Sequence, residues 1–201
     1  MDYSQNGEQK IIMDYFKDFE GTLLDIGAND GETLSNSRAL MLNGWTGVLV
    51  EPSETAFKKL KDLYWNNTKA RLCNAGISNV SGVQKFYESG THLKKGDTSL
   101  LSTLDSKELK RWEGSDNEFK ETNIKCITYS QLKEFYDYKF DFINIDAEGL
   151  DWEILKQINL SDTICLCIET NSIDDQKYID YCANFGLKVL HKNFENIIFG
   201  L

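Results

Sequence analysis

Proline is almost absent from this sequence: Pro52 is the single proline among 201 residues. No low-complexity stretch or internal repeat occurs either, so nothing marks a linker, and we expect residues 1–201 to form one domain. Long apolar runs are also absent, since none approaches the roughly 18 to 20 residues that span a bilayer. Residues 1–10 are polar and lack the apolar core of a signal peptide. We therefore expect no membrane partner.

Positive charge is scarce, because 22 Lys and Arg residues face 32 Asp and Glu residues and leave a net charge of −10 at pH 7. A surface of this charge repels phosphate backbones, so we expect no nucleic-acid partner. The five cysteines are odd in number and contain no Cys-x-x-Cys pair. Most lie in apolar runs, which indicates reduced, buried thiols and favours a cytoplasmic location.

Short apolar runs alternate with helical patterns along the chain, an order typical of a parallel sheet built from β-α-β units. We predict strands at 22–26, 47–50, 71–75, 82–88, 123–128, 141–145 and 163–168, and helices at 10–19, up to 43, 53–65, 150–158 and 172–186. Two further apolar segments, 187–191 and 196–199, lie too close together for a crossover helix and should form an antiparallel hairpin. The expected fold is α/β and doubly wound: a Rossmann-like, seven-stranded, mostly parallel sheet with a C-terminal antiparallel hairpin.

Three helix ends carry recognisable signals. Gly44 stands where a C-terminal glycine cap belongs. Ser53 is the expected N-terminal cap of its helix. Ser172 with Asp175 resembles a capping box at the start of the last helix.

A glycine-bearing turn follows the first predicted strand, in the run LDIGANDGET. Its glycines, Gly27 and Gly31, do not form the Gly-x-Gly-x-x-Gly pattern that seats a pyrophosphate. Asp25 and Asp30 flank them, and two carboxylates would repel a pyrophosphate but suit a positively charged cofactor. S-adenosylmethionine, with its sulfonium and amino groups, is such a cofactor. Asp25, Gly27, Asn29 and Asp30 are therefore candidate cofactor-binding residues.

Glu51 ends the second predicted strand, where doubly wound folds place the acid that accepts hydrogen bonds from both ribose hydroxyls. This position favours an adenosine-containing cofactor without a 2′-phosphate. Asn74 and Ala75 end the third predicted strand and are expected to border the adenine. A Rossmann-type domain that binds another nucleotide is the alternative.

Two acids in the run Asp146-Ala147-Glu148-Gly149 follow a buried predicted strand, at the edge where doubly wound folds bind ligands. If a methyl group passes from such a cofactor to a hydroxyl, the hydroxyl must lose its proton. Asp146 or Glu148 can act as the general base if burial or mutual repulsion raises one pKa, and Asp146 is also a candidate cofactor contact. Two alternatives stay open: the pair holds Mg²⁺ or Mn²⁺, or Glu148 merely caps the following helix.

Residues 89–122 are polar, contain glycine and show little periodicity. A connection of this length without regular structure usually serves a function, so we predict a lid or substrate loop. His92 lies within it and is a candidate proton acceptor; a solvated loop residue is an equally good interpretation.

The runs LDIGANDGET, VLVEPS, NAGISN and INIDAEGLDWEIL together resemble the FkbM family of S-adenosylmethionine-dependent methyltransferases. The segment from Tyr3 to Glu8 is similar to the one that precedes the first helix of that family, which makes Gln5 a candidate cofactor-binding residue. Thr98-Ser99-Leu100 resembles its short serine motif. The resemblance covers the chain from residue 3 to about residue 170, and it implies the class I methyltransferase fold and O-methylation of sugar or polyketide-derived hydroxyls.

The leading hypothesis is an O-methyltransferase that acts on a hydroxyl of a sugar or glycan. A methyltransferase for a lipid, a polyketide or another small molecule is the second hypothesis. The third is a module that binds S-adenosylmethionine without catalysis.

Overall fold

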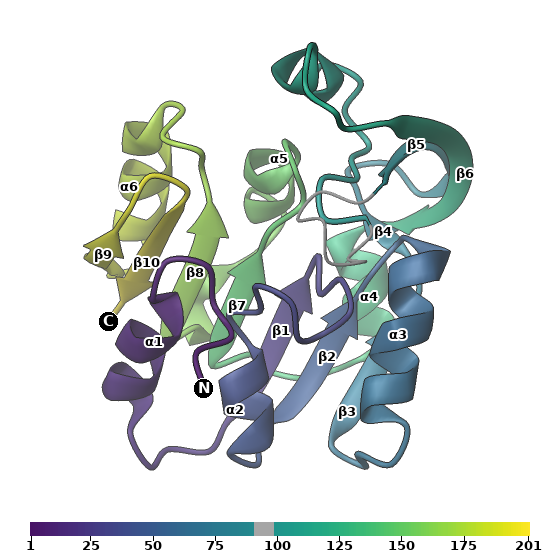
Figure 1. Cartoon of the computed structure of the whole chain (residues 1–201). Helices are drawn as coiled ribbons and strands as arrows, with labels where there is room; N and C mark the ends of the chain where they lie inside the picture. The colour runs from purple at the N-terminus through teal and green to yellow at the C-terminus, as the bar shows by residue number, and fades with distance from the viewer. Residues whose placement is uncertain (91–98) are drawn as a thin grey trace.

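The computed structural model describes residues 1–90 and 99–201, and Figure 1 shows a central sheet with helices on both sides. The sheet has seven strands in the order β3-β2-β1-β7-β8-β10-β9. These strands are β1 (Thr22–Ile26), β2 (Thr46–Val50), β3 (Ala70–Cys73), β7 (Phe142–Ile145), β8 (Cys165–Glu169), β9 (Lys188–Lys192) and β10 (Asn196–Gly200). The first five are parallel, whereas β10 pairs antiparallel with β8 and β9. The predicted doubly wound sheet and its C-terminal hairpin are confirmed.

The two faces of the sheet carry separate apolar cores, because side chains alternate along each strand. The described α-helices are α1 (Glu8–Phe16), α2 (Arg38–Leu42), α3 (Glu54–Tyr64), α4 (Tyr129–Phe135), α5 (Asp151–Leu155) and α6 (Asp175–Ala183). Leu23 of β1 packs in one core with residues of α1, α2 and α3. Leu24, the next residue, packs in the other core with residues of α4, α5 and α6. The helices are thus divided between both faces of the sheet.

A second, smaller sheet stands beside the main one in the order β4-β6-β5. Its strands are β4 (Gly76–Ile77), β5 (Gly82–Ser89) and β6 (Phe119–Ile127), and a 3₁₀ helix, η1 (Glu108–Trp112), lies between β5 and β6. The prediction of irregular structure across 89–122 is therefore wrong at both ends. Most side chains of β5 and β6 are at least partly exposed, so the apolar alternation that identifies strands is weak. Backbone pairing holds the two strands together.

The helix starts confirm one signal and reveal another. Ser53 accepts a hydrogen bond from the backbone N–H of Ala56 at 3.2 Å, so it caps α3 as expected. α4 was not predicted, yet Thr128 and Gln131 form a reciprocal capping box at its start. This short helix has one buried apolar residue, Leu132, which is too little periodicity to identify it from sequence.

The capping box expected at Ser172 and Asp175 does not form. The Ser172 hydroxyl donates to the carbonyl oxygen of Phe194 at 2.8 Å, and α6 begins after Asp174 without a side-chain cap. The Asp175 carboxylate pairs instead with Lys192 of the neighbouring hairpin. Tertiary contacts with β9 and its turn therefore replace the local cap.

All five cysteines are free, and Cys126, Cys165, Cys167 and Cys182 are buried, in agreement with the prediction of free, mostly buried thiols. No helix within the described part of the chain has the length and apolar character needed to cross a membrane.

Glu8 connects the start of α1 to the C-terminal hairpin. Its side chain is fully buried and accepts hydrogen bonds from Asn193 Nδ2 at 2.6 Å, Asn196 Nδ2 at 3.0 Å and the backbone N–H of Asn6 at 2.8 Å. Burial alone would raise the pKa of Glu8, but these hydrogen bonds favour the carboxylate more strongly and leave the pKa lowered. The charged form of Glu8 is thus part of the folded state.

We expect Glu8→Ala to lower the free energy of unfolding by about 1–3 kcal/mol at pH 7, because buried amide donors lose their acceptor. Since the pKa is lowered in the folded protein, this stabilisation is present above the ordinary value of 4.5 and is lost as pH falls below it. Urea unfolding at pH 7 and at acidic pH measures both effects. The exposed variant Glu20→Ala should change little; equal stability of wild type and Glu8→Ala at pH 7 would contradict the assignment.

Candidate active site

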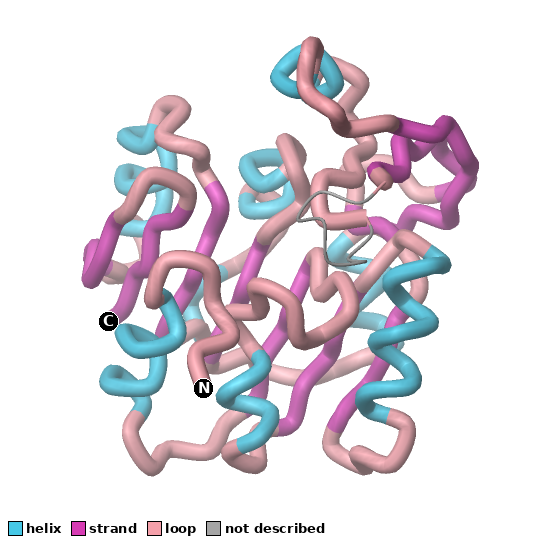
Figure 2. The backbone as a smooth tube through the Cα atoms, in the orientation of Figure 1, coloured by secondary structure: helices cyan, strands magenta, loops and turns pink. Residues whose placement is uncertain are grey.

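The turn after β1 and the loop after β7 lie against each other at one end of the sheet (Figure 2). Gly27 has a φ of +87°, and a Cβ placed on it would stand 1.7 Å from the backbone carbonyl oxygen of Asp146. The backbone N–H of Asp146 also donates to the carbonyl of Ile26 at 2.9 Å. Glycine is therefore required at this position by a contact within the protein, in addition to any approach of a ligand.

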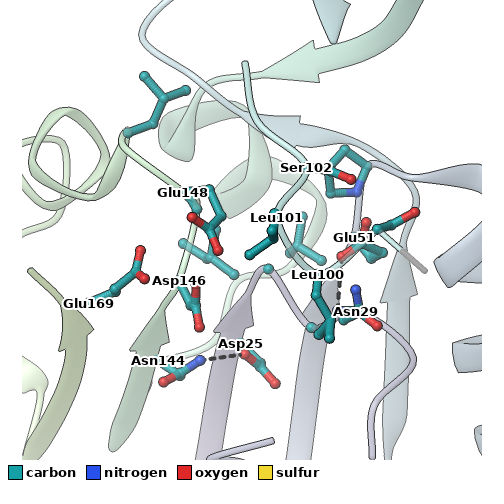
Figure 3. Close-up of a pocket in the computed structure, with 18 of the residues that line it drawn as sticks. Asp25, Asn29, Glu51, Leu100, Leu101, Ser102, Asn144, Asp146, Glu148 and Glu169 are labelled. Atoms are coloured by element: carbon teal, nitrogen blue, oxygen red, sulfur yellow. Dashed lines mark hydrogen bonds between the residues drawn. The ribbon is translucent and has the colours of Figure 1, made fainter. Parts of the chain in front are cut away.

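Glu51 lies directly after β2 and is buried, with 4% of its surface exposed. One carboxylate oxygen accepts from the backbone N–H of Asn29 at 2.8 Å (Figure 3). The other accepts from the backbone N–H of Ser53 at 2.7 Å. Burial outweighs these hydrogen bonds and raises the pKa of Glu51 to about 8. Each oxygen retains acceptor capacity, so the carboxylate can still receive the two hydroxyls of a ribose.

Asp25 lies in β1 at the base of the same pocket and is part of a buried polar chain. Its carboxylate accepts hydrogen bonds from the Ser37 hydroxyl and from Asn144 Nδ2, the latter at 2.9 Å. Asn36 Nδ2 in turn donates to Asn144 Oδ1 at 3.1 Å. Burial raises the pKa of Asp25. These hydrogen bonds connect β1 to β7 and to the segment before α2.

Other predicted cofactor-binding residues share this pocket. Asn29 and Ala75 line it next to Glu51 and Gly27. Gln5, from the segment before α1, lines it on another side, and its Nε2 donates to Glu195 Oε1 at 2.9 Å. The structure thus brings together residues from four separate segments of the sequence.

Two predicted cofactor-binding residues lie elsewhere. Asp30 turns back on its own loop, where it accepts from the backbone N–H of Thr33 at 2.7 Å, and it does not line the pocket. Asn74 Nδ2 donates to the carbonyl of Glu51 at 2.9 Å and faces a separate, smaller cavity. Both residues support the shape of the site from outside.

The loop after β7 holds the two predicted acids in place by means of a third. The Asp151 carboxylate accepts from the backbone N–H groups of Ala147 at 2.8 Å and Gly149 at 3.1 Å. Glu148 between them adopts a positive φ of 45°, and α5 begins after Leu150 with no side-chain cap. The side chain of Glu148 therefore does not cap this helix, and it enters the pocket instead.

Asp146 and Glu148 share the pocket with Glu169 at the end of β8, and Figure 3 shows the three carboxylates turned toward one another. Desolvation and the negative charge of Asp151 raise the pKa of Asp146 to about 8. Burial and the charge of Asp146 raise the pKa of Glu148 well above its ordinary value, and burial raises that of Glu169. Carboxylates that lie this close repel one another, and a shared proton or cation relieves the repulsion.

The segment from Ser99 to η1 covers the acids and forms one wall of the pocket. Ser99, Leu100 and Leu101 line it, and Figure 3 shows Leu101 between Glu148 and Glu51. Thr103 Oγ1 donates to the carbonyl of Glu148 at 2.6 Å. The predicted substrate loop thus contributes to the pocket, whereas His92 and Thr98 lie outside the described residues.

Sequence reasoning missed several pocket residues, among them Asn36, Asn144, Glu169 and Glu195. It also missed Asp151, which holds the loop after β7 from outside the pocket. Glu169 had the clearest signal, because it directly follows the predicted strand 163–168 and the carboxyl ends of parallel strands meet at one edge. Glu195 had none, since it lies in the turn of the terminal hairpin.

Comparison with solved structures identifies the class of this fold. A proposed RNA methyltransferase from Pyrococcus horikoshii aligns with a TM-score of 0.50 and 12% sequence identity, covering 97% of this chain and 84% of that one. A precorrin-6y C5,15-methyltransferase from Geobacter metallireducens GS-15 aligns with a TM-score of 0.48 and 11% identity, over 96% of this chain and 85% of that one. The similarity to the Pyrococcus horikoshii protein concerns the fold alone, which is the class I methyltransferase fold.

The sequence itself identifies the family. A family model described as the methyltransferase FkbM domain matches residues 25–189. The chain therefore belongs to the FkbM family of methyltransferases, as its motifs predicted, and membership implies S-adenosylmethionine as the methyl donor. A comparison with curated protein sequences finds no match.

We expect Glu51→Gln to weaken binding of S-adenosylhomocysteine roughly 10–100-fold, because the glutamine NH₂ replaces an accepting oxygen and a buried hydroxyl left without its acceptor costs about 1–3 kcal/mol. Isothermal titration calorimetry measures this change. Glu54→Gln is a matched control, since Glu54 is an exposed acid of the same segment outside the main pocket. Unchanged affinity in a folded Glu51→Gln variant would remove the ribose assignment.

Proposed function

We propose that this methyltransferase transfers a methyl group to a hydroxyl of a sugar or glycan. The observation that carries the proposal is the position of Asp146 and Glu148 in the same cavity as the Gly27 turn and Glu51. A donor held by the turn and Glu51 and an acceptor beside the two acids would meet within one enclosed space. Such positioning supplies much of the catalysis of methyl transfer.

The residues of the pocket fit the donor. The two carboxylate oxygens of Glu51 keep acceptor capacity for a ribose diol, and Gly27 leaves backbone exposed beside it. We assign cofactor contacts to Gln5, Gly27, Asn29, Glu51 and Ala75, with Asp25 beneath them and Asp146 at the border with the acceptor. When bound, S-adenosylmethionine supplies an electrophilic methyl group.

The two acids provide the base that an oxygen acceptor needs. Glu148 is buried and Asp146 is partly exposed to the pocket, so a hydroxyl that enters can donate its hydrogen bond to either carboxylate. Transfer of that proton to the carboxylate increases the nucleophilicity of the oxygen. We place the proton acceptor at Asp146 or Glu148; His92 remains a candidate from the sequence alone.

A sugar suits the acceptor side of the pocket. Arg111 of η1 lies 3.8 Å from Glu148, and Trp112 of the same helix also lines the pocket. A combination of an aromatic face with several convergent polar groups is suited to a ring that carries hydroxyls. The charge of −10 favours an acceptor without a phosphate backbone. A lipid or polyketide hydroxyl, and a module that binds the cofactor without chemistry, remain the alternatives.

A screen with methyl-labelled S-adenosylmethionine against nucleotide sugars, oligosaccharides, lipids and polyketides tests the acceptor. We expect label on a sugar hydroxyl, and we expect Asp146→Asn to lower kcat by about 10²–10⁴-fold if this residue is the base. Glu153→Gln, an acid of α5 paired with Lys156 on the surface, should retain full activity.

Each alternative gives a different result. Full turnover by Asp146→Asn would move the base to Glu148. Label found on a lipid or polyketide would replace the sugar. Binding of S-adenosylhomocysteine with no product from any acceptor would favour the non-catalytic module.

A further inference from the structure

Three carboxylates from separate segments meet at the acceptor side of the pocket. Asp146 follows β7, Glu148 lies two residues beyond it, and Glu169 ends β8. One ligand oxygen from each lies within 4.8 Å of the others. The parallel pairing of β7 with β8 brings the ends of these strands side by side. We refer to Asp146, Glu148 and Glu169 as the acidic trio.

A second observation indicates that the trio has room for a ligand. Glu169 is buried, with 8% of its surface exposed, and its Oε2 atom has no hydrogen-bond partner among residues 1–90 and 99–201. Figure 3 shows this side chain turned toward Asp146 and Glu148. A carboxylate oxygen that is removed from water without a partner is costly. The position therefore requires a donor or a cation that residues 1–90 and 99–201 do not supply.

Arg111, the cationic side chain that pairs with the trio among the described residues, does not fill this position. Arg111 Nη1 lies 3.8 Å from Glu148 and 3.6 Å from Glu108, and its Nη2 donates to Asn171 Oδ1 at 2.8 Å. The positive charge of Arg111 is thus divided between Glu108 and Glu148. Within the described part of the chain, Asp146 and Glu169 form no ion pair.

We propose that the acidic trio binds one divalent cation, Mg²⁺ or Mn²⁺, and that the acceptor hydroxyl completes its coordination. Hard cations of this type prefer carboxylate oxygens. Ligand oxygens of Mg²⁺ stand about 3 Å apart when adjacent and about 4.2 Å apart when opposite, so the trio, with oxygens within 4.8 Å, would close by roughly 1–2 Å around the ion. The role of the cation in the reaction rests on the proposed function, whereas its binding does not.

The cation would complete the acceptor chemistry. A hydroxyl bound to a divalent cation loses its proton more easily. The O–H bond would break, and the proton would pass to a carboxylate oxygen of Asp146 or Glu148. The oxygen lone pair forms the new O–CH₃ bond while the S–CH₃ bonding pair returns to sulfur, leaving a neutral thioether. Atoms and charge balance without an oxidant or reductant.

Titration of the metal-stripped full chain with MnCl₂, followed by the electron paramagnetic resonance of free Mn²⁺, tests the site without any acceptor. We expect one Mn²⁺ per chain. Loss of an outer partner alone weakens metal sites about 10–100-fold, so Glu169→Gln should weaken Mn²⁺ binding at least about tenfold. Glu148→Gln provides a second variant. Glu153→Gln is the control, because Glu153 is a half-buried acid of α5 that pairs with Lys156, and this variant should bind Mn²⁺ as wild type does.

The outcomes separate this proposal from the proposed function. Absence of saturable Mn²⁺ binding, or wild-type binding by folded Glu169→Gln and Glu148→Gln, would overturn the cation site. Methyl transfer that persists in excess EDTA would overturn its role in the reaction and leave the methyltransferase intact. Mn²⁺ bound through the trio without transfer to any hydroxyl would support the site and refute the O-methyltransferase.

Discussion

The backbone of Gly27 rests against the carbonyl of Asp146, and the geometry of the site depends on this contact. Any side chain at Gly27 would overlap that oxygen, at 1.7 Å from its Cβ. The β1–β7 ladder extends past the strand ends through the bond from Asp146 to Ile26. As a result, the Gly27 turn and the loop that carries the acids form one continuous edge of the pocket. The proposed donor and acceptor sides are thereby joined through the backbone.

Acidic side chains are concentrated at that edge, and burial changes their pKa values. Glu51, Asp146, Glu148 and Glu169 all line one cavity, and burial raises the pKa of each. Glu51 receives two backbone N–H groups, which prepare it for neutral hydroxyls. The trio has fewer internal donors, and the cation that we propose there would offset its desolvation. The two ends of the pocket thus differ in chemistry although both are acidic.

The predictions that the structure confirms rested on signals within a few residues of sequence. Those that were wrong concern positions where a contact with a distant segment decides the conformation. The strand at 22–26 and the Ser53 cap follow from apolar runs and side-chain chemistry within a few residues. The strands predicted at 82–88 and 123–128 are confirmed by β5 and β6, but no apolar pattern marks the extension of β6 back to Phe119, which depends on backbone pairing with β5. Asp175 carries a capping pattern, but its pairing with Lys192 overrides that pattern. Local preference decides a structure only where no distant partner competes.

The sequence alone determined where strands occur along the chain, and with it which residues stand at the carboxyl ends of β1, β2 and β7. Gly27, Glu51 and Asp146 could be identified in that way, because a parallel sheet places consecutive strand ends on one edge. Only the tertiary structure decided where side chains point. Asp30 turns into its own loop, and Glu169 joins the acids. These directions depend on loop hydrogen bonds and on the pairing of β7 with β8, which no local pattern in the sequence records.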